Sequence, residues 1–313
     1  MTSPKIGFAG AGGVGCYFGG RLALAGFDVT LIGRGQHIQA IDENGLKLTL
    51  NGEGHVVKLG AADTNTEETL QKLSELDWLF VTCKTYQSEA IMASILPHIG
   101  SETKIVSLQN GVDGPLHLSE LAGRPVYGGL SIRFVAHVTG PGKVTATGDG
   151  YVQMGAYPNG SDMEMSALGE AMQKAGLDFR VSDDIRRELW RKIVINNGVN
   201  PICALLQRDC EIVFSNPETA VLVDQMMQET VLAARAEDIH LSDDEVAELR
   251  GIIFGLGPVK PSMQVDREQG RQLELDAIAG AIIERAKRYG ASAPVTETIY
   301  RLLTAELAFE KQA

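Results

Sequence analysis

The feature that most constrains the fold is a glycine-rich segment near the amino terminus. It matches the pattern GxGxxG and consists of Gly10, Ala11, Gly12, Gly13, Val14 and Gly15. An apolar stretch typical of a buried strand, Lys5–Ala9, precedes it, and Gly13–Ala25 carries apolar residues at helical spacing. In this context the glycines allow a tight turn and a close approach to a pyrophosphate, which the amino terminus of the helix then binds. We therefore predict a dinucleotide-binding turn; a merely tight strand-to-helix turn is the alternative.

The end of the second predicted strand, Asp28–Ile32, indicates which dinucleotide is bound. Enzymes that use NAD place an acid there, which accepts a hydrogen bond from the ribose 2′-hydroxyl. No acid occurs between Val29 and Ala40, and Arg34 follows the strand instead. A guanidinium suits a 2′-phosphate by charge and by bidentate geometry, so we predict NADPH/NADP+ as the cofactor. An exposed loop arginine without a ligand is the alternative.

The alternation of strand and helix patterns predicts parallel βαβ units in the first half of the chain. Buried strands are expected at Trp78–Cys83 and Lys104–Leu108, and Asn51-Gly52 indicates a hairpin turn between Leu46–Leu50 and His55–Leu59. Three more strand-rich segments are expected to extend the same sheet: Val126–Val138, Gly142–Thr147 and Tyr151–Ala156.

From Asp183 onward, long helical patterns replace the strands. They cover Ile185–Leu206, Thr219–Glu237, Asp243–Gly251, Arg267–Tyr289 and Thr296–Ala308. The predicted class is therefore α/β, with an N-terminal Rossmann-type parallel-sheet domain over residues 1–182 followed by an all-helical C-terminal domain over residues 183–313.

The first of these helices carries polar residues on one face. Lys192, Asn196 and Asn200 lie at i, i+4 and i+8. A stripe of one ammonium and two amides, flanked by Ile and Val, suits the lining of a cleft that binds hydroxyl and carboxylate groups. A solvated face, or amides that satisfy a kink at Pro201, is the alternative.

Composition excludes several function classes. The chain has 28 Lys and Arg against 40 Asp and Glu, a net charge of −12, which argues against nucleic acid or an anionic membrane as a partner. The cysteines and histidines lack metal-ligand spacing, so we expect no metal site. No signal-peptide pattern or long apolar run is evident, so we expect a cytoplasmic protein. A homodimer is compatible with the helical second domain.

At the level of motifs the sequence resembles the ketopantoate reductase family (2-dehydropantoate 2-reductases) over nearly the whole chain. Besides the glycine turn and Arg34, the resemblance rests on these segments: Val81-Thr82-Cys83-Lys84-Thr85, Leu108-Gln109-Asn110-Gly111, Leu189-Trp190-Arg191-Lys192 with Asn196 and Asn200-Pro201, Pro261-Ser262-Met263-Gln264-Val265-Asp266, and Gly270-Arg271-Gln272-Leu273-Glu274-Leu275-Asp276.

The resemblance implies NADPH-dependent reduction of a 2-keto acid to a 2-hydroxy acid, with 2-dehydropantoate (ketopantoate) giving pantoate in pantothenate biosynthesis, in a cleft between the two domains. The roles it implies are Lys192 as general acid or electrophile, Glu274 as its partner, Asn196, Asn200 and Ser262 at the substrate, Lys84 at the cofactor, and Asn110 and Glu274 at both ligands. A lysine titrates at about 10.4 when free, so it needs burial to act as an acid near neutral pH.

Two positions depart from the family pattern. Cys210 stands about where the family commonly has an asparagine, and Ala279 replaces an asparagine before Gly280. Because of these two positions, a reductase of the same family that acts on another 2-keto acid or carbonyl compound remains an alternative function. A non-catalytic NADP(H)-binding protein is the other alternative.

Overall fold

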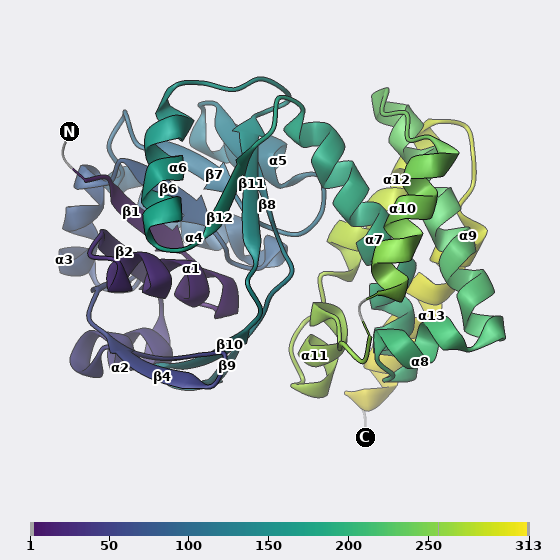
Figure 1. Ribbon diagram of the computed structural model, residues 1–313, viewed down its shortest axis with the longest axis horizontal. Helices are drawn as coiled ribbons and strands as arrows, with labels where there is room; N and C mark the ends of the chain where they lie inside the picture. Colours follow the sequence, from purple (N-terminus) through teal and green to yellow (C-terminus); the bar gives the residue numbers. More distant parts are fainter. Residues whose placement is uncertain (1–2, 256, 312–313) are drawn as a thin grey trace. The chain divides into compact units, whose positions relative to one another are not determined.

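The computed structural model describes residues 3–255 and 257–311, and the chain divides into two units (Figure 1). The first unit comprises Met1–Gln109 and Asp113–Arg186, and the second comprises Asn110–Val112 and Arg187–Ala313. The division lies four residues beyond the boundary expected between Ser182 and Asp183. It also assigns a short loop after a strand of the first unit, Asn110–Val112, to the helical unit.

An eight-stranded sheet forms the centre of the first unit, in the order β12-β11-β8-β7-β6-β1-β2-β5. All neighbouring strands are parallel except β8 and β11. The strands are β1 (Lys5–Ala9), β2 (Asp28–Gly33), β5 (Gly60–Asp63), β6 (Trp78–Val81), β7 (Lys104–Ser107), β8 (Val126–Ile132), β11 (Tyr151–Ala156) and β12 (Asp178–Val181). The predicted Rossmann-type sheet is thus confirmed.

Helices connect these strands, as the parallel pairing requires. They are α1 (Gly13–Leu24), α2 (Gly35–Asn44), α3 (Glu67–Leu70), α4 (Ser88–Ile95), α5 (Gly114–Ala122) and α6 (Glu164–Lys174).

A second, four-stranded sheet lies in the first unit, in the order β4-β3-β10-β9. Its strands are β3 (Leu46–Leu50), β4 (Glu53–Val57), β9 (Val135–Gly140) and β10 (Lys143–Thr147). The predicted hairpin at Asn51-Gly52 is confirmed, with both residues at positive φ, 47° and 90°, although its second strand begins at Glu53, two residues before the expected His55.

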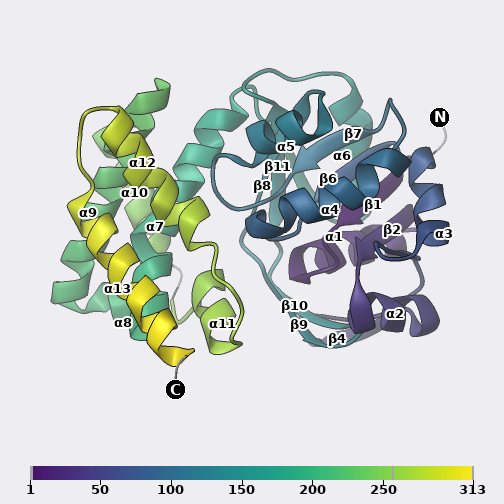
Figure 2. The same ribbon diagram turned by 180° about the vertical axis from the view of Figure 1, so that it is seen from behind.

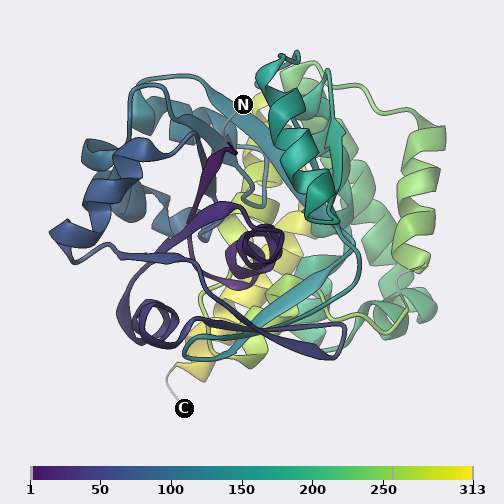
Figure 3. The same cartoon turned by 60° about the vertical axis from the view of Figure 1, so that its left-hand side comes forward.

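The expectation that all strands from Val126 to Ala156 extend one sheet is wrong, because β9 and β10 belong to this second sheet. The chain leaves β8 at Arg133, whose φ of 67° is left-handed, and Phe134 then stacks on Tyr17 of α1 with ring centroids 4.4 Å apart. Helix α1 is consequently covered on both faces, by the large sheet and by the small one (Figure 3). Because α1 is covered on two sides, its apolar residues do not mark a single buried face. The sequence of α1 therefore could not predict that two different sheets pack against it.

The second unit is helical in its described residues. Its helices are α7 (Ile185–Leu206), which begins just before the unit boundary, α8 (Cys210–Ser215), α9 (Pro217–Ala234), α10 (Asp243–Phe254), α11 (Ser262–Glu268), α12 (Ala281–Arg288) and α13 (Pro294–Glu310). Helix α13 packs against α9 and α12 (Figure 2). In its core the Asn197 amide of α7 donates to the hydroxyls of Thr230 and Thr296.

The predicted continuous helix Arg267–Tyr289 is wrong. Helix α11 ends at Glu268, and Gly270 adopts a φ of 64° that terminates it. Helical structure resumes only at Leu275, as a π-helical turn over Asp276–Gly280 that leads into α12. Glu274 therefore precedes a helix instead of lying inside one. None of the helices in the described part of the chain combines the length and apolar character needed to cross a bilayer.

Candidate active site

The glycine turn joins β1 to α1, and steric contacts dictate three of its glycines. Gly10 has a φ of 115°, and a Cβ there would lie 2.4 Å from the Cys83 nitrogen. A Cβ on Gly13 would lie 2.1 Å from the Ala136 carbonyl oxygen, and one on Gly15 would lie 2.3 Å from the Gly10 oxygen. Such separations are far inside van der Waals contact, so a side chain at any of these positions would displace backbone.

Gly12 differs from the other glycines of the turn, because a Cβ there would meet no atom within 4 Å. Gly12 is also the N-cap of α1, where no side chain caps the helix and no acidic residue occupies the first turn. Space is therefore open beside the N-cap of α1, and the uncapped N–H groups and positive dipole end of this helix suit the phosphates of a dinucleotide.

Two cations follow strands that border this turn. Arg34, exposed at the N-cap of α2, comes directly after β2, and a Cβ on Gly33 would lie 3.3 Å from Ala11 of the turn. Lys84 comes directly after Cys83, the residue that Gly10 approaches, and is half-buried. Both are at carboxyl ends of parallel strands, where open α/β sheets bind their ligands.

In the second unit, three residues distant in sequence form a continuous hydrogen-bonded chain. The Lys192 Nζ donates to the Asn110 Oδ1 at 3.2 Å, and the Asn110 Nδ2 donates to the Glu274 Oε2 at 3.1 Å. These partners fix the orientation of the Asn110 amide, because its oxygen faces the ammonium and its nitrogen faces the carboxylate. Glu274 as a whole residue is buried and only 5% exposed.

The environment lowers the pKa of Lys192 from 10.5 to about 8. Burial is the main cause, because it disfavours the charged ammonium, and the nearby Glu274 carboxylate raises the pKa in opposition. A lysine with this pKa is protonated at neutral pH and gives up its proton far more readily than a free lysine does.

The other predicted substrate residues lie in the same unit. Asn196 and Asn200 continue the face of α7 that carries Lys192, with Asn196 half-buried and Asn200 buried. Ser262 is exposed at the first position of α11, outside the hydrogen-bonded chain of Lys192. Cys210 and Ala279, the two departures from the family pattern, are both fully buried.

A glycine brings Asn110 close to Glu274. Gly111 has a φ of 95°, and a Cβ on it would lie 2.8 Å from the Ala277 carbonyl oxygen. Any other residue there would push the Asn110 loop away from the segment that carries Glu274.

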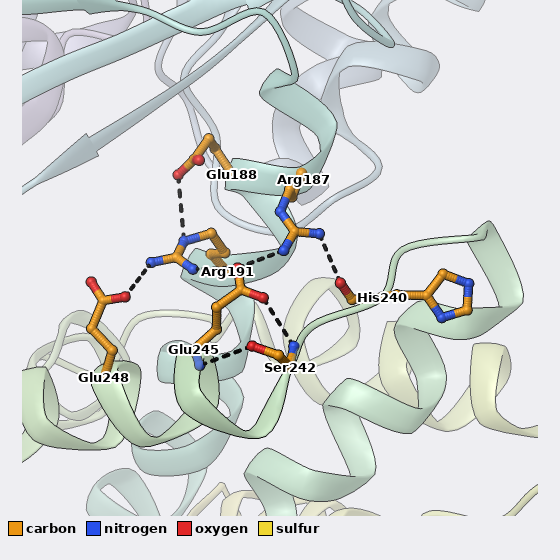
Figure 4. A network of polar contacts seen from close by, with 7 residues as sticks. All are labelled: Arg187, Glu188, Arg191, His240, Ser242, Glu245 and Glu248. Atoms are coloured by element: carbon orange, nitrogen blue, oxygen red, sulfur yellow. Dashed lines mark hydrogen bonds and ion pairs between the residues drawn. The ribbon is translucent and has the colours of Figure 1, made fainter.

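An ion-pair network that the sequence analysis missed anchors the start of α7 on α10 (Figure 4). Arg187 donates to the His240 carbonyl oxygen and pairs with Glu245, and Arg191 pairs with both Glu245 and Glu248. A hydrogen bond from the Ser242 backbone N–H is the main reason that the pKa of Glu245 is lowered to about 2, and the Arg187 side chain lowers it further. Because Arg191 immediately precedes Lys192, the network fixes the helical turn that presents the lysine. The capping box of Ser242 and Glu245 was readable from sequence; its arginine partners were not.

Comparisons with known proteins agree on one family. The family model "Ketopantoate reductase PanE/ApbA" matches residues 6–159, and "Ketopantoate reductase PanE/ApbA C terminal" matches residues 184–307. The 2-dehydropantoate 2-reductase of Pyrococcus horikoshii is 32% identical, over 96% of this chain and 97% of the relative. That of Lactococcus lactis is 28% identical, over 96% of each chain.

Solved structures extend the likeness. A PanE/ApbA family ketopantoate reductase from Ralstonia eutropha superposes with a TM-score of 0.88 at 27% identity, covering 99% of this chain and 100% of that one. D-mandelate dehydrogenase, in a ternary structure with NADH and anilino(oxo)acetate, gives 0.89 at 28% identity, covering 97% and 98%. Because both units match and the relatives align end to end, the chain belongs to the ketopantoate reductase family.

Proposed function

We propose that the protein is an NADPH-dependent 2-keto acid reductase, which converts 2-dehydropantoate to pantoate. The observation that carries the proposal is the Lys192 ammonium, whose pKa of about 8 suits an acid and which Asn110 links to the Glu274 carboxylate. The names of the relatives in Pyrococcus horikoshii and Lactococcus lactis support the substrate.

The residues of the first unit fit a nicotinamide dinucleotide phosphate. The open space at Gly12 and the uncapped amino terminus of α1 suit the pyrophosphate, Arg34 would hold the 2′-phosphate, and Lys84 would contact the cofactor from the neighbouring strand end. When bound, NADPH supplies the hydride for the carbonyl carbon.

The residues of the second unit would stabilise the negative charge that develops on the keto oxygen and supply the proton. As the keto oxygen becomes an alkoxide, the Lys192 ammonium stabilises it and donates the proton that completes the hydroxyl group. The Asn110 Oδ1 accepts a hydrogen bond from the Lys192 ammonium and so orients its remaining N–H groups. The Glu274 carboxylate keeps the lysine protonated near neutral pH, while Asn196, Asn200 and Ser262 would bind the substrate carboxylate and hydroxyl groups.

A second candidate function keeps the reaction and changes the substrate. D-mandelate dehydrogenase is as similar in structure as the ketopantoate reductase of Ralstonia eutropha, with TM-scores of 0.89 and 0.88. Buried Cys210 and Ala279 replace amides expected from the family pattern. The structural likeness favours a 2-keto acid with a larger apolar substituent, such as phenylglyoxylate, and the two replacements keep such a change of substrate open.

A substrate panel tests both candidates. Loss of NADPH absorbance is followed with 2-dehydropantoate, phenylglyoxylate and pyruvate, and the preferred substrate has the highest kcat/KM. Lys192→Ala is expected to lower kcat by a factor of about 10²–10⁴ while NADPH binding persists. Binding of NADPH without turnover of any 2-keto acid would instead establish the non-catalytic NADP(H)-binding protein.

Two further expectations stay proposals. The four cysteines are buried and form no disulfide in the described part of the chain, which supports a reducing compartment such as the cytoplasm. A homodimer is to be tested by sedimentation.

A further inference from the structure

The chain forms a π-helical turn directly after the carboxylate of the proposed site. Glu274 precedes the first helical residue, and the turn spans Asp276–Gly280. The Ala281 N–H donates to the Asp276 carbonyl, five residues earlier, and the Ile278 N–H donates to the Glu274 carbonyl at 3.2 Å. The backbone of Glu274 is therefore part of this turn. Turns of this kind are rare and occur frequently at functional sites.

Tyr300 of α13 holds the turn from one side. Its hydroxyl donates to the Asp276 Oδ1 at 2.6 Å, a length typical of a hydroxyl that donates to a carboxylate. Helix α13 is itself anchored, because the Glu229 carboxylate accepts hydrogen bonds from the N–H groups of Val295 and Thr296 at 2.9 and 2.8 Å. Tyr300 is thus a fixed point against which the turn is placed.

The Asn110 loop meets the same turn through another of its residues. A Cβ on Gly111 would lie 2.8 Å from the Ala277 oxygen, so the two backbones are in close contact there. The adjacent Asn110 donates to Glu274. The turn therefore lies between two supports, and a shift of Asp276 would carry Ala277 and Glu274 with it.

We propose that Asp276 and Tyr300 form a positioning pair, which holds the π turn so that the Glu274 carboxylate stays against Asn110 and Lys192. Neither residue has a catalytic role in this inference, which rests on the proposed function of Lys192 and Glu274. The pair acts through backbone geometry: Tyr300 fixes Asp276, and Asp276 fixes the turn that ends on Glu274.

The consequence can be measured at the lysine. Among the described residues, the charge that acts on the pKa of Lys192 is the Glu274 carboxylate, which raises it against the effect of burial. Arg301 lies close enough to Tyr300 to act on the phenol, and it pairs with Glu297 on its own helix. If the turn relaxes, Glu274 moves away and the pKa of Lys192 falls below about 8.

The test compares Tyr300→Phe with a matched control, Tyr289→Phe, which removes a hydroxyl from a half-exposed tyrosine at the end of α12. Tyr300→Phe is expected to lower kcat by about 3- to 100-fold, the effect of a small misplacement, and to move the alkaline limb of the kcat/KM pH profile down by about half a pH unit or more. Asp276→Asn, which keeps an oxygen acceptor, is expected to have a smaller effect of the same kind. In the Glu274→Gln background, Tyr300→Phe is expected to cause no further shift.

An unchanged limb in Tyr300→Phe and Asp276→Asn, with only a lower Tm, would assign the pair a purely structural role and overturn the proposal. If Tyr300→Phe does not fold, Asp276→Asn decides alone. The titration of Lys192 by NMR of ¹³C-labelled lysine, assigned with Lys192→Arg, needs no turnover. A wild-type protein without activity would therefore refute the proposed function, while the lysine titration would still judge the positioning pair.

Discussion

The glycine turn at residues 10–15 and the cluster of Lys192, Asn110 and Glu274 are built in opposite ways. The turn consists of consecutive residues whose identities follow from steric contacts at Gly10, Gly13 and Gly15. The cluster joins Asn110 to Lys192 and Glu274 across 82 and 164 residues of sequence. A binding site made of backbone N–H groups can be encoded locally, whereas a lysine of altered acidity needs distant segments to bury it and a distant carboxylate to oppose that burial.

The two regions also differ in what can perturb them. The turn offers backbone N–H donors and space, so a substitution disturbs it by adding side-chain volume. The cluster depends on charge, so it responds to pH.

The largest expected effect on cofactor binding comes from an alanine substitution in the turn, Gly15→Ala, and Gly12→Ala serves as its control. Gly15→Ala drives a Cβ to within 2.3 Å of the Gly10 oxygen, so it is expected to lower both the Tm and NADPH affinity, the latter by more than about 100-fold, about 2.7 kcal/mol. Gly12→Ala, whose Cβ meets no protein atom, is expected to leave the Tm unchanged and weaken NADPH about tenfold. Calorimetry of folding and binding separates the two. Equal losses of stability would contradict the assignment of Gly12 to the ligand side.

The pH dependence of turnover sharpens the comparison. With the pKa of Lys192 in the free protein at about 8, kcat/KM for keto acid reduction is expected to be level below that pH and to fall about tenfold per pH unit above it, because the proton donor is lost. NADPH affinity, measured by fluorescence over the same range, is expected to change little. A limb near the pKa of a free lysine would exclude Lys192 as the donor.

A charge can be removed on the cofactor side as well. Arg34→Ala is expected to weaken NADPH about tenfold and NADH hardly at all, because only NADPH carries the 2′-phosphate. Parallel titrations with the two cofactors measure the ratio. A similar loss for both cofactors would show that Arg34 does not bind the 2′-phosphate.

The smallest expected effect concerns the network in Figure 4. Glu245→Gln is expected to lower the free energy of unfolding by about 1 kcal/mol at neutral pH, since the site is partly exposed. The pKa of Glu245 is lowered from 4.5 to about 2, so its contribution is present above pH 4.5 and is lost as the pH falls toward 2. Denaturant unfolding of both proteins is therefore expected to converge in acid. A difference that does not depend on pH would contradict this.

Sequence reasoning succeeded where local rules decide. The Rossmann-type sheet, the hairpin at Asn51-Gly52 and the span of α7 follow from periodicity and turn chemistry, and the structure confirms them. It failed where tertiary contacts decide. Nothing local to β9 and β10 shows that they leave the main sheet, and the apolar spacing around Leu273 and Leu275 concealed the break after Gly270.

The site shows the same division. The face of Lys192, Asn196 and Asn200 is a property of one helix and could be read from their spacing. The hydrogen bonds of Asn110 and those of the arginines to Glu245 link segments that are far apart in the sequence. No rule of residue spacing predicts that these segments lie close together. For Glu274 and Asn110 the resemblance to a family supplied the roles, and physical reasoning on the sequence alone would have left a solvated carboxylate and a turn asparagine.

The burial of α1 between two sheets has a consequence for protein engineering. Ala136 of the small sheet lies against Gly13, and Leu48 lies against Gly20, so that sheet is part of the wall that shapes the dinucleotide turn. A minimal cofactor-binding module that omits residues 133–148 would expose apolar side chains of α1. It would also remove the contact of Ala136 with Gly13 that shapes the glycine turn. The small sheet is thus a structural part of the first unit, and a graft of the cofactor-binding unit onto another enzyme must include strands β9 and β10.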